Sequence, residues 1–202
     1  KVSDDKVLLS TCDMSNEESV ESLYKTVVDV FDSIDILINN CGTWSLKQID
    51  QLESNEIDYH FNNNFKSTIL GTKFFSKYNK KSGVIINMSS FSSFLPMKNG
   101  SLYSALKSSI KTFTRSSAAE LGIKGIRVNC IIPGVIRTPM TSKYIDDNYD
   151  MLVEPIALGR IGSCEDIANC ALFLCSDLSN YIRILDEKIT TREKQIAILI
   201  EQ

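Results

Sequence analysis

The 202 residues are enough for one domain of ordinary size with a buried core. Hydrophobic residues make up 43% and charged residues 23% of the chain, with nine glycines and four prolines, which excludes a disordered or fibrous protein. The net charge of -3 at pH 7 gives no electrostatic reason to expect nucleic acid or an anionic membrane as a partner.

Cysteine and histidine usage argues against a metal site. The six cysteines form no C-x-x-C pair, and His60 is the single histidine, so we expect no metal ion and a reduced, cytoplasmic environment. We expect no membrane segment, because no apolar run approaches the ~20 residues that span a bilayer and no signal peptide opens the chain. The chain begins with Lys1 rather than Met, and we expect an upstream segment.

Strand-like and helical patterns alternate along the chain. The expected strands are Val7–Leu9, Ile34–Ile38, Val84–Met88 and Ile126–Ile132. The expected helices run from Ser15 to Phe31, Ser54 to Phe74, Tyr103 to Leu121 and Ser163 to Leu174. Glu18 and Asp166 complete capping boxes at the first and last helix, and Gly122 closes the third. The stretch from Thr138 to Pro155 is expected to be an irregular loop that covers the substrate.

This alternation predicts an α/β fold, because parallel strands need crossover helices and are covered by them on both faces. We expect a doubly wound parallel sheet of Rossmann type in residues 1–182, followed by a divergent tail in residues 183–202. Ligands of such sheets bind outside the carboxyl ends of the strands. The informative side chains should therefore follow the strands directly.

Four residues at those positions suggest acid–base chemistry. Tyr103 and Lys107 are four apart at the start of a helix, so both can serve one site. The ammonium of Lys107 is expected to lower the pKa of Tyr103. Ser90 follows a buried strand, and Asn64 stands mid-helix, where Asn is unfavourable unless its side chain or a disturbed backbone has a role. Taken singly, each motif also fits turn chemistry or a solvated helix pair.

Jointly, these motifs resemble the short-chain dehydrogenase/reductase family from Val7 to about Ile182. The resemblance lies in Asn87–Ser90 with the Y-x-x-x-K of Tyr103 and Lys107, in Asn64, and in an NNAG-like turn with Cys41 in place of Ala. Further matches are Asp13-Met14, Arg127–Asn129, Pro133-Gly134, Thr138 and Leu158–Gly162. Together these motifs are specific to the family.

The resemblance implies hydride transfer between NAD or NADP and a carbonyl or alcohol substrate. It assigns proton transfer to Tyr103 and binding of the substrate oxygen to Ser90. Lys107 would lower the pKa of Tyr103 and bind the nicotinamide ribose, and Asn64 would support a water in the proton path. The implied cofactor contacts are Asp13, Met14, Asn40, Cys41, Gly42, Tyr103, Lys107, Pro133, Gly134, Ile136 and Thr138. A complete chain is expected to form a homodimer or homotetramer.

Two departures from the family pattern leave a second interpretation open. The nine glycines show no G-x-x-x-G-x-G spacing, and a final glycine-containing strand does not follow Ile182, so we expect a sheet without its first two strands and its last. We also expect weak NAD(P) binding by these 202 residues. The alternative is a truncated paralogue that acts as a non-catalytic interaction or dimerisation module. His60 is interpreted as a surface or packing residue, and Trp44 either lines a substrate pocket or covers the end of the sheet.

Overall fold

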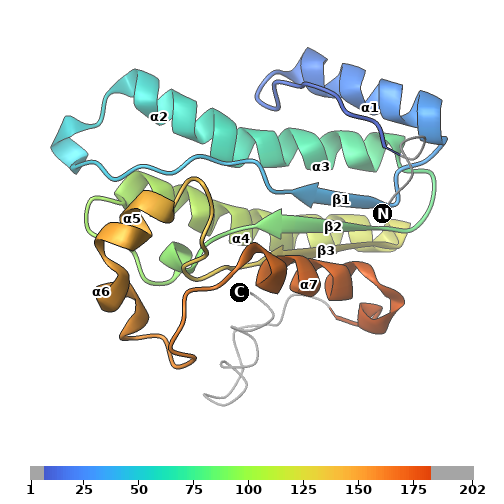
Figure 1. Cartoon of the computed structure of the whole chain (residues 1–202). Helices are drawn as coiled ribbons and strands as arrows, with labels where there is room; N and C mark the ends of the chain where they lie inside the picture. Colours follow the sequence, from blue (N-terminus) through green and yellow to red (C-terminus); the bar gives the residue numbers. More distant parts are fainter. Residues whose placement is uncertain (1–6, 183–202) are drawn as a thin grey trace.

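The computed structural model describes residues 7–182, and the tail at 183–202 lies outside the described residues. Its centre is a parallel sheet of three strands in the order β1-β2-β3 (Figure 1). The strands are β1 (Ile36–Asn39), β2 (Gly83–Met88) and β3 (Ile126–Ile131). This arrangement confirms the predicted α/β parallel sheet.

Helices cover both faces of the sheet. They are α1 (Glu17–Phe31), α2 (Ser54–Phe61), α3 (Ser67–Tyr78), α4 (Ser101–Leu121), α5 (Ser142–Asp147), α6 (Tyr149–Val153) and α7 (Cys164–Cys175). The crossover from β1 to β2 contains α2 and α3, and the crossover from β2 to β3 contains α4. In Figure 1, α7 lies across the sheet from α4, while α5 and α6 lie beyond the carboxyl ends of the strands.

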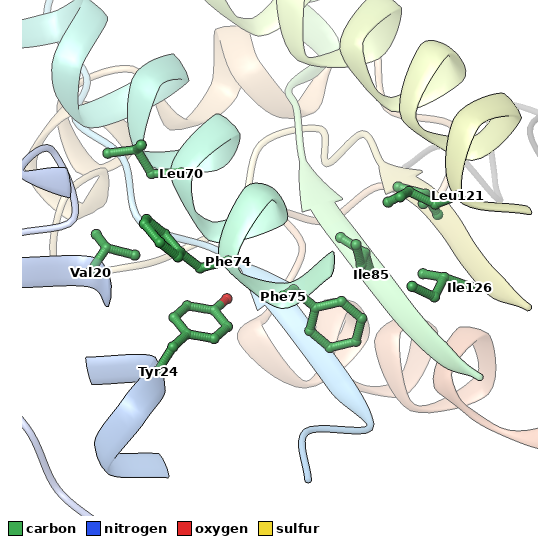
Figure 2. Close-up of a cluster of buried hydrophobic side chains, with 9 residues drawn as sticks. Val20, Tyr24, Leu70, Phe74, Phe75, Ile85, Leu121 and Ile126 are labelled. Carbon is green, nitrogen blue, oxygen red and sulfur yellow. The ribbon is translucent and has the colours of Figure 1, made fainter. Parts of the chain in front are cut away.

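Three apolar clusters form the core: a large one on each face of the sheet, and a small one of Ile110, Cys130 and Ile132 between α4 and β3. The first joins α1, α3 and α4 to the sheet, and Figure 2 shows its side chains. Its buried members are Val20, Tyr24, Leu70, Phe74, Phe75, Ile85, Leu121, Ile126 and Val128. The second cluster packs α7 on the other face and contains Val84, Ile86, Ile131, Ala171 and Leu174. Alternate strand residues serve opposite clusters, as the two-residue period of a strand requires.

A ladder of buried amides ties the layers together. Asn39 donates from Nδ2 to Asn87 Oδ1 at 2.8 Å, and Asn87 donates to the Thr114 hydroxyl on α4 at 2.9 Å. A Cβ on Gly71 of α3 would lie 2.3 Å from Asn39 Oδ1, so only glycine lets the helix approach this amide. These contacts fix α3 and α4 relative to the carboxyl ends of β1 and β2.

Two predicted elements are wrong. Val7–Leu9 is not a strand, because the described residues place no neighbouring strand beside it and a strand needs a hydrogen-bonded partner. The stretch from Thr138 to Pro155 is not irregular, because it contains α5 and α6. Apolar residues there, such as the fully buried Ile145, anchor helices that are too short to show a helical period in the sequence.

The helix ends also correct the sequence analysis in detail. Helix α1 is capped by Asn16, whose side chain accepts from the Ser19 N–H at 2.9 Å, and not by Ser15. Ser15 instead bonds the Asp13 carboxylate. After α4, Gly122 continues in helical conformation, and the left-handed residue is Gly125 at φ 71°. The capping box at Ser163 and Asp166 is confirmed.

Candidate functional site

Three loop segments follow the carboxyl ends of the strands, where ligands of a doubly wound sheet bind. The loop after β1 begins at Asn40, the loop after β2 begins at Ser89, and Ile132-Pro133-Gly134 follows β3. The Phe91 N–H donates to the Pro133 carbonyl at 2.8 Å, which holds the second and third loops together. The ends of β2 and β3 therefore form one continuous surface.

Ser90 and Tyr103 meet above β2. Ser90 has extended backbone, and its Oγ accepts from the Ser92 N–H at 3.2 Å, so the hydroxyl is held at the head of a short 3-10 turn. The first turn of α4 brings Tyr103 close enough for the Ser90 side chain to lower the pKa of the phenol. The structure thus places two of the predicted site residues beside each other.

Lys107 lies one helical turn beyond Tyr103 and is 5% exposed. Its Nζ donates to the Met88 carbonyl at 3.0 Å and lies 5.7 Å from the centre of the Tyr103 ring. The Ser89 hydroxyl donates to the Lys107 carbonyl at 2.7 Å. Lys107 therefore connects α4 to the end of β2 through both its side chain and its backbone carbonyl. Burial lowers the pKa of Lys107 to about 8.

The pKa of Tyr103 departs from the sequence-based expectation. Burial raises the pKa of Tyr103 above its ordinary value, and the nearby Ser90 side chain offsets only part of that rise. Lys107 does not lower it, because the ammonium lies beside the ring and bonds the Met88 carbonyl instead of the phenolic oxygen. Ser90 is the group that favours the phenolate in this structure.

Asn64 lies at the centre of an irregular helical turn and is fully buried. Residues Asn62–Lys66 form a π-helical turn between α2 and α3, which confirms the expectation of a disturbed backbone. The Asn64 side chain donates to the Thr43 hydroxyl and to the His60 carbonyl, each at 3.1 Å, and accepts from the Thr43 N–H at 3.1 Å. Its orientation is therefore completely determined.

Gly42 separates Asn64 from Lys107. A Cβ on Gly42 would lie 2.8 Å from Asn64 Oδ1 and 3.4 Å from Lys107 Nζ, so the missing side chain keeps the space beside the ammonium open. This contact brings the loop after β1, the π-helical turn and α4 to one point. All four predicted acid–base residues thus lie around the carboxyl ends of β1 and β2.

The predicted cofactor residues divide between two places. Met14, Asn40 and Cys41 line one groove of about 340 Å³ beside β1. Asp13 is exposed next to Met14, and two hydrogen bonds from Ser15 lower the pKa of its carboxyl.

The remaining predicted cofactor residues follow β3. Pro133 is held by Phe91, and Gly134 is exposed, with no heavy atom within 4 Å of where a Cβ would stand. Ile136 pairs with Gly162 in an isolated bridge, and the Thr138 N–H donates to the Thr141 hydroxyl at 3.0 Å. These residues form an ordered segment between β3 and α5.

Sequence reasoning missed Thr43 and did not foresee the contacts of His60 and Trp44. Thr43 bonds Asn64, and His60 is neither exposed nor merely packed, since hydroxyl groups bond both ring nitrogens. Trp44 meets Tyr144 of α5 edge to face at 5.3 Å between ring centres. The hydroxyl of Thr43, directly after the glycine of the NNCG turn, was the one sequence signal for this network.

Comparison with known proteins decides the family. A family model described as enoyl-(acyl carrier protein) reductase matches residues 2–184, most of the chain. The chain belongs to the short-chain dehydrogenase/reductase family. As a member of this family, the chain is an oxidoreductase of the NAD(P)-dependent kind.

Curated relatives and solved structures agree with this assignment. The chain is 34% identical to an uncharacterized oxidoreductase of Mycobacterium bovis, over 89% of this chain and 73% of the relative. It is 32% identical to a cyclopentanol dehydrogenase of Comamonas (84% and 70%) and 34% to a 3-oxoacyl-(acyl-carrier-protein) reductase of Aquifex aeolicus (83% and 68%). A short-chain alcohol dehydrogenase structure from Sinorhizobium meliloti superposes with a TM-score of 0.82 at 29% identity, over 86% and 71% of the chains.

The residues present fit the nicotinamide and ribose end of NAD(P). Among the described residues, the Met88 carbonyl is the one hydrogen-bond acceptor of the buried Lys107 ammonium, which leaves N–H groups for a ribose hydroxyl. Gly42 keeps the adjoining space free of a side chain. Within residues 7–182, no helix is long and apolar enough to cross a bilayer, and no three metal-ligating side chains gather.

Proposed function

We propose that this protein reduces a small-molecule carbonyl compound, or oxidises the matching alcohol, with Tyr103 as the proton donor and acceptor. The bound nicotinamide supplies the hydride. Ser90 would hold the substrate oxygen next to the Tyr103 hydroxyl, so that Tyr103 can donate its proton to that oxygen or accept a proton from it. The gathering of Ser90, Tyr103 and Lys107 at the end of β2 carries the proposal. Lys107 Nζ donates to the Met88 carbonyl and lies 5.7 Å from the centre of the Tyr103 ring, and the Ser90 side chain is near enough to act on the Tyr103 hydroxyl.

Lys107 would bind the nicotinamide ribose and stabilise the Tyr103 phenolate. Its Nζ is fixed by the Met88 carbonyl and shielded from water, so a charge beside it is weakly screened. Bringing a ribose hydroxyl between the ammonium and the phenol would connect the two groups, which are too far apart to hydrogen-bond now. This connection would supply the lowering of the Tyr103 pKa that the present geometry lacks.

The wider cofactor surface would combine the two groups of loop residues. Met14, Asn40 and Cys41 share the groove beside β1, and Asp13 stands exposed at its end, where we place the adenosine side. Pro133, Gly134, Ile136 and Thr138 follow β3, and we place the nicotinamide next to them. Gly42 would admit the ribose between these regions.

Substituting Tyr103 by Phe tests this function. Turnover of ketones or secondary alcohols found by screening should fall by about 10²- to 10⁴-fold, because the phenolic proton is the one that the reaction uses. The equilibrium affinity for NADH or NADPH should change little, since the ring and Lys107 remain. Tyr181→Phe is the control, because Tyr181 is 96% exposed and remote from Ser90. Turnover in Tyr103→Phe at the level of Tyr181→Phe would reject the proposal.

A further inference from the structure

His60 links the proposed site to the protein surface. It occupies the last turn of α2 and is 8% exposed, and it is the only histidine of the chain. Its Nδ1 lies 2.9 Å from the Thr43 hydroxyl, and its Nε2 lies 2.9 Å from the Ser45 hydroxyl. Ser45 is exposed, so the ring bridges a buried hydroxyl and a solvent-accessible one.

The hydrogen bonds of Asn64 determine which ring nitrogen carries the proton. The Asn64 amide nitrogen can only donate, so Thr43 Oγ1 is its acceptor. The proton of the Thr43 hydroxyl is then free to be donated to His60 Nδ1. With Nδ1 bare this proton has an acceptor, whereas with a hydrogen on Nδ1 it would have none among the described residues. We therefore assign the hydrogen of the neutral ring to Nε2, which faces the Ser45 hydroxyl. Donation thus runs in one direction, from Asn64 through Thr43 to His60.

We propose that His60 is a positioning residue, whose neutral ring holds the Asn64 amide through the Thr43 hydroxyl and whose protonation breaks the bond between Asn64 and Thr43 Oγ1. A protonated ring has N–H groups on both nitrogens, so Nδ1 can no longer accept. Thr43 Oγ1 would then face two N–H donors while its own proton loses its acceptor, which is costly in a buried site. The consequence for catalysis rests on the proposed function, in which Asn64 stands across Gly42 from Lys107.

The surroundings of the ring favour the neutral form at neutral pH. Burial lowers the pKa of His60 below its ordinary value, and the carboxylate of Glu56 offsets part of that effect. Lys47 pairs with Glu56, which reduces the influence of that carboxylate. Tyr59 packs edge to face on the ring at 5.4 Å, and the charge on the α4 side is Lys107, beyond Asn64. Loss of the bond between Asn64 and Thr43 Oγ1 is therefore expected on acidification, at a pH below the ordinary pKa of histidine.

Nitrogen-15 NMR can observe this directly, because the chain has one imidazole. At pH 7.5 we expect a ring protonated at Nε2 alone. As the ring titrates, the side-chain amide signals of Asn64 should shift with the same midpoint. Thr43→Val should uncouple the two sets of signals, while Thr26→Val, which removes a hydroxyl on the exposed face of α1, should leave them coupled. An Asn64 amide that ignores the His60 titration would overturn the proposal.

Kinetics separate positioning from simple packing. Asn at position 60 can accept from Thr43 near the Nδ1 position but does not titrate, whereas Leu cannot accept. We expect kcat to fall roughly tenfold in His60→Leu and to be partly restored in His60→Asn. In the unsubstituted protein kcat should decrease at acidic pH, and in His60→Asn this decrease should be absent. An acidic decline of kcat that persists unchanged in His60→Asn would overturn the link to catalysis. Absence of turnover in the unsubstituted protein would count against the proposed function, and the NMR titration would still decide the role of His60.

Discussion

At the scale of single residues, Lys107 shows a conflict between stability and the proposed chemistry. An ammonium that is 5% exposed has lost most of its hydration, and one carbonyl, that of Met88, compensates only in part. The pKa of Lys107 is lowered from 10.5 to about 8 because the buried ammonium is not fully compensated for its lost hydration. Such destabilising groups are typical of functional sites, where a ligand supplies the missing partner.

Replacing Lys107 by Met should therefore stabilise the fold while abolishing turnover. The pKa difference sets an upper limit of about 3 kcal/mol, and the lost bond to Met88 removes about 1 kcal/mol of that gain. The gain should be full below pH 8 and should shrink up to pH 10.5, because the folded protein then releases the Lys107 proton before the unfolded chain does.

Thermal unfolding at pH 7 and pH 10 measures this gain. Lys81→Met is the matched control, since Lys81 is exposed and its replacement should leave the free energy of unfolding nearly unchanged. A Lys107→Met protein less stable than the unsubstituted protein at pH 7 would show that the ammonium is well satisfied in the folded state.

Residue types and spacing predicted part of the site and missed the rest for identifiable reasons. Ser90, Tyr103, Lys107 and Asn64 could be found because each occupies a strand end or a helix position where its chemistry is unusual. The pKa of Tyr103 could not be predicted, because a four-residue spacing does not say whether an ammonium meets the ring or the hydroxyl. The contacts of His60 depend on how the loop after β1 folds, which no local pattern encodes.

At the scale of elements, helix periods were predictable and helix ends less so. The continuous apolar period from Ser54 to Phe74 predicted one helix, whereas the structure inserts a π-helical turn at Asn62–Lys66. One extra residue per turn is invisible to a period measured over many residues, and Asn64 was its only local sign. Two polar residues before α1, Ser15 and Asn16, both suit a cap, so sequence alone chose wrongly between them.

Alanine substitutions at these two positions test the cap of α1. Asn16→Ala should lower the free energy of unfolding by about 1 kcal/mol, because the Ser19 N–H loses its acceptor. Ser15→Ala should change it by less than about 0.5 kcal/mol, since Ser15 makes exposed bonds to Asp13. Chemical denaturation of both variants gives the comparison, and a larger loss for Ser15→Ala would reverse the assignment of the cap.

At the scale of the whole molecule, the sheet is covered unequally. Ile36 and Ile38 pair in register with Val84 and Ile86, so all four face the side on which α7 packs. Helix α7 covers Val84 and Ile86 of β2, while Ile36 and Ile38 of β1 remain 47% and 46% exposed. Within the described residues β1 pairs only with β2, so its other edge also presents free backbone groups.

This surface should cause these 202 residues to self-associate. Apolar side chains beside an open strand edge favour pairing between copies. Ile38→Lys should shift the sedimentation profile toward monomer, whereas Leu158→Lys should not, because Leu158 is 78% exposed in the segment between α6 and α7. Equal self-association of the two variants would assign the contact to another surface.

The transfer of deuterium is the most direct test of the central claim, that the site at the carboxyl ends of the strands carries hydride chemistry. The protein would be given a ketone and reduced cofactor deuterated on the transferring face of the nicotinamide, and the alcohol analysed by mass spectrometry. We predict deuterium on the carbinol carbon with the unsubstituted protein and with Tyr181→Phe. With Tyr103→Phe we predict that labelled alcohol forms at least about 10²-fold more slowly. Labelled alcohol formed equally fast by Tyr103→Phe, or none formed by the unsubstituted protein with any ketone of the screen, would contradict the account.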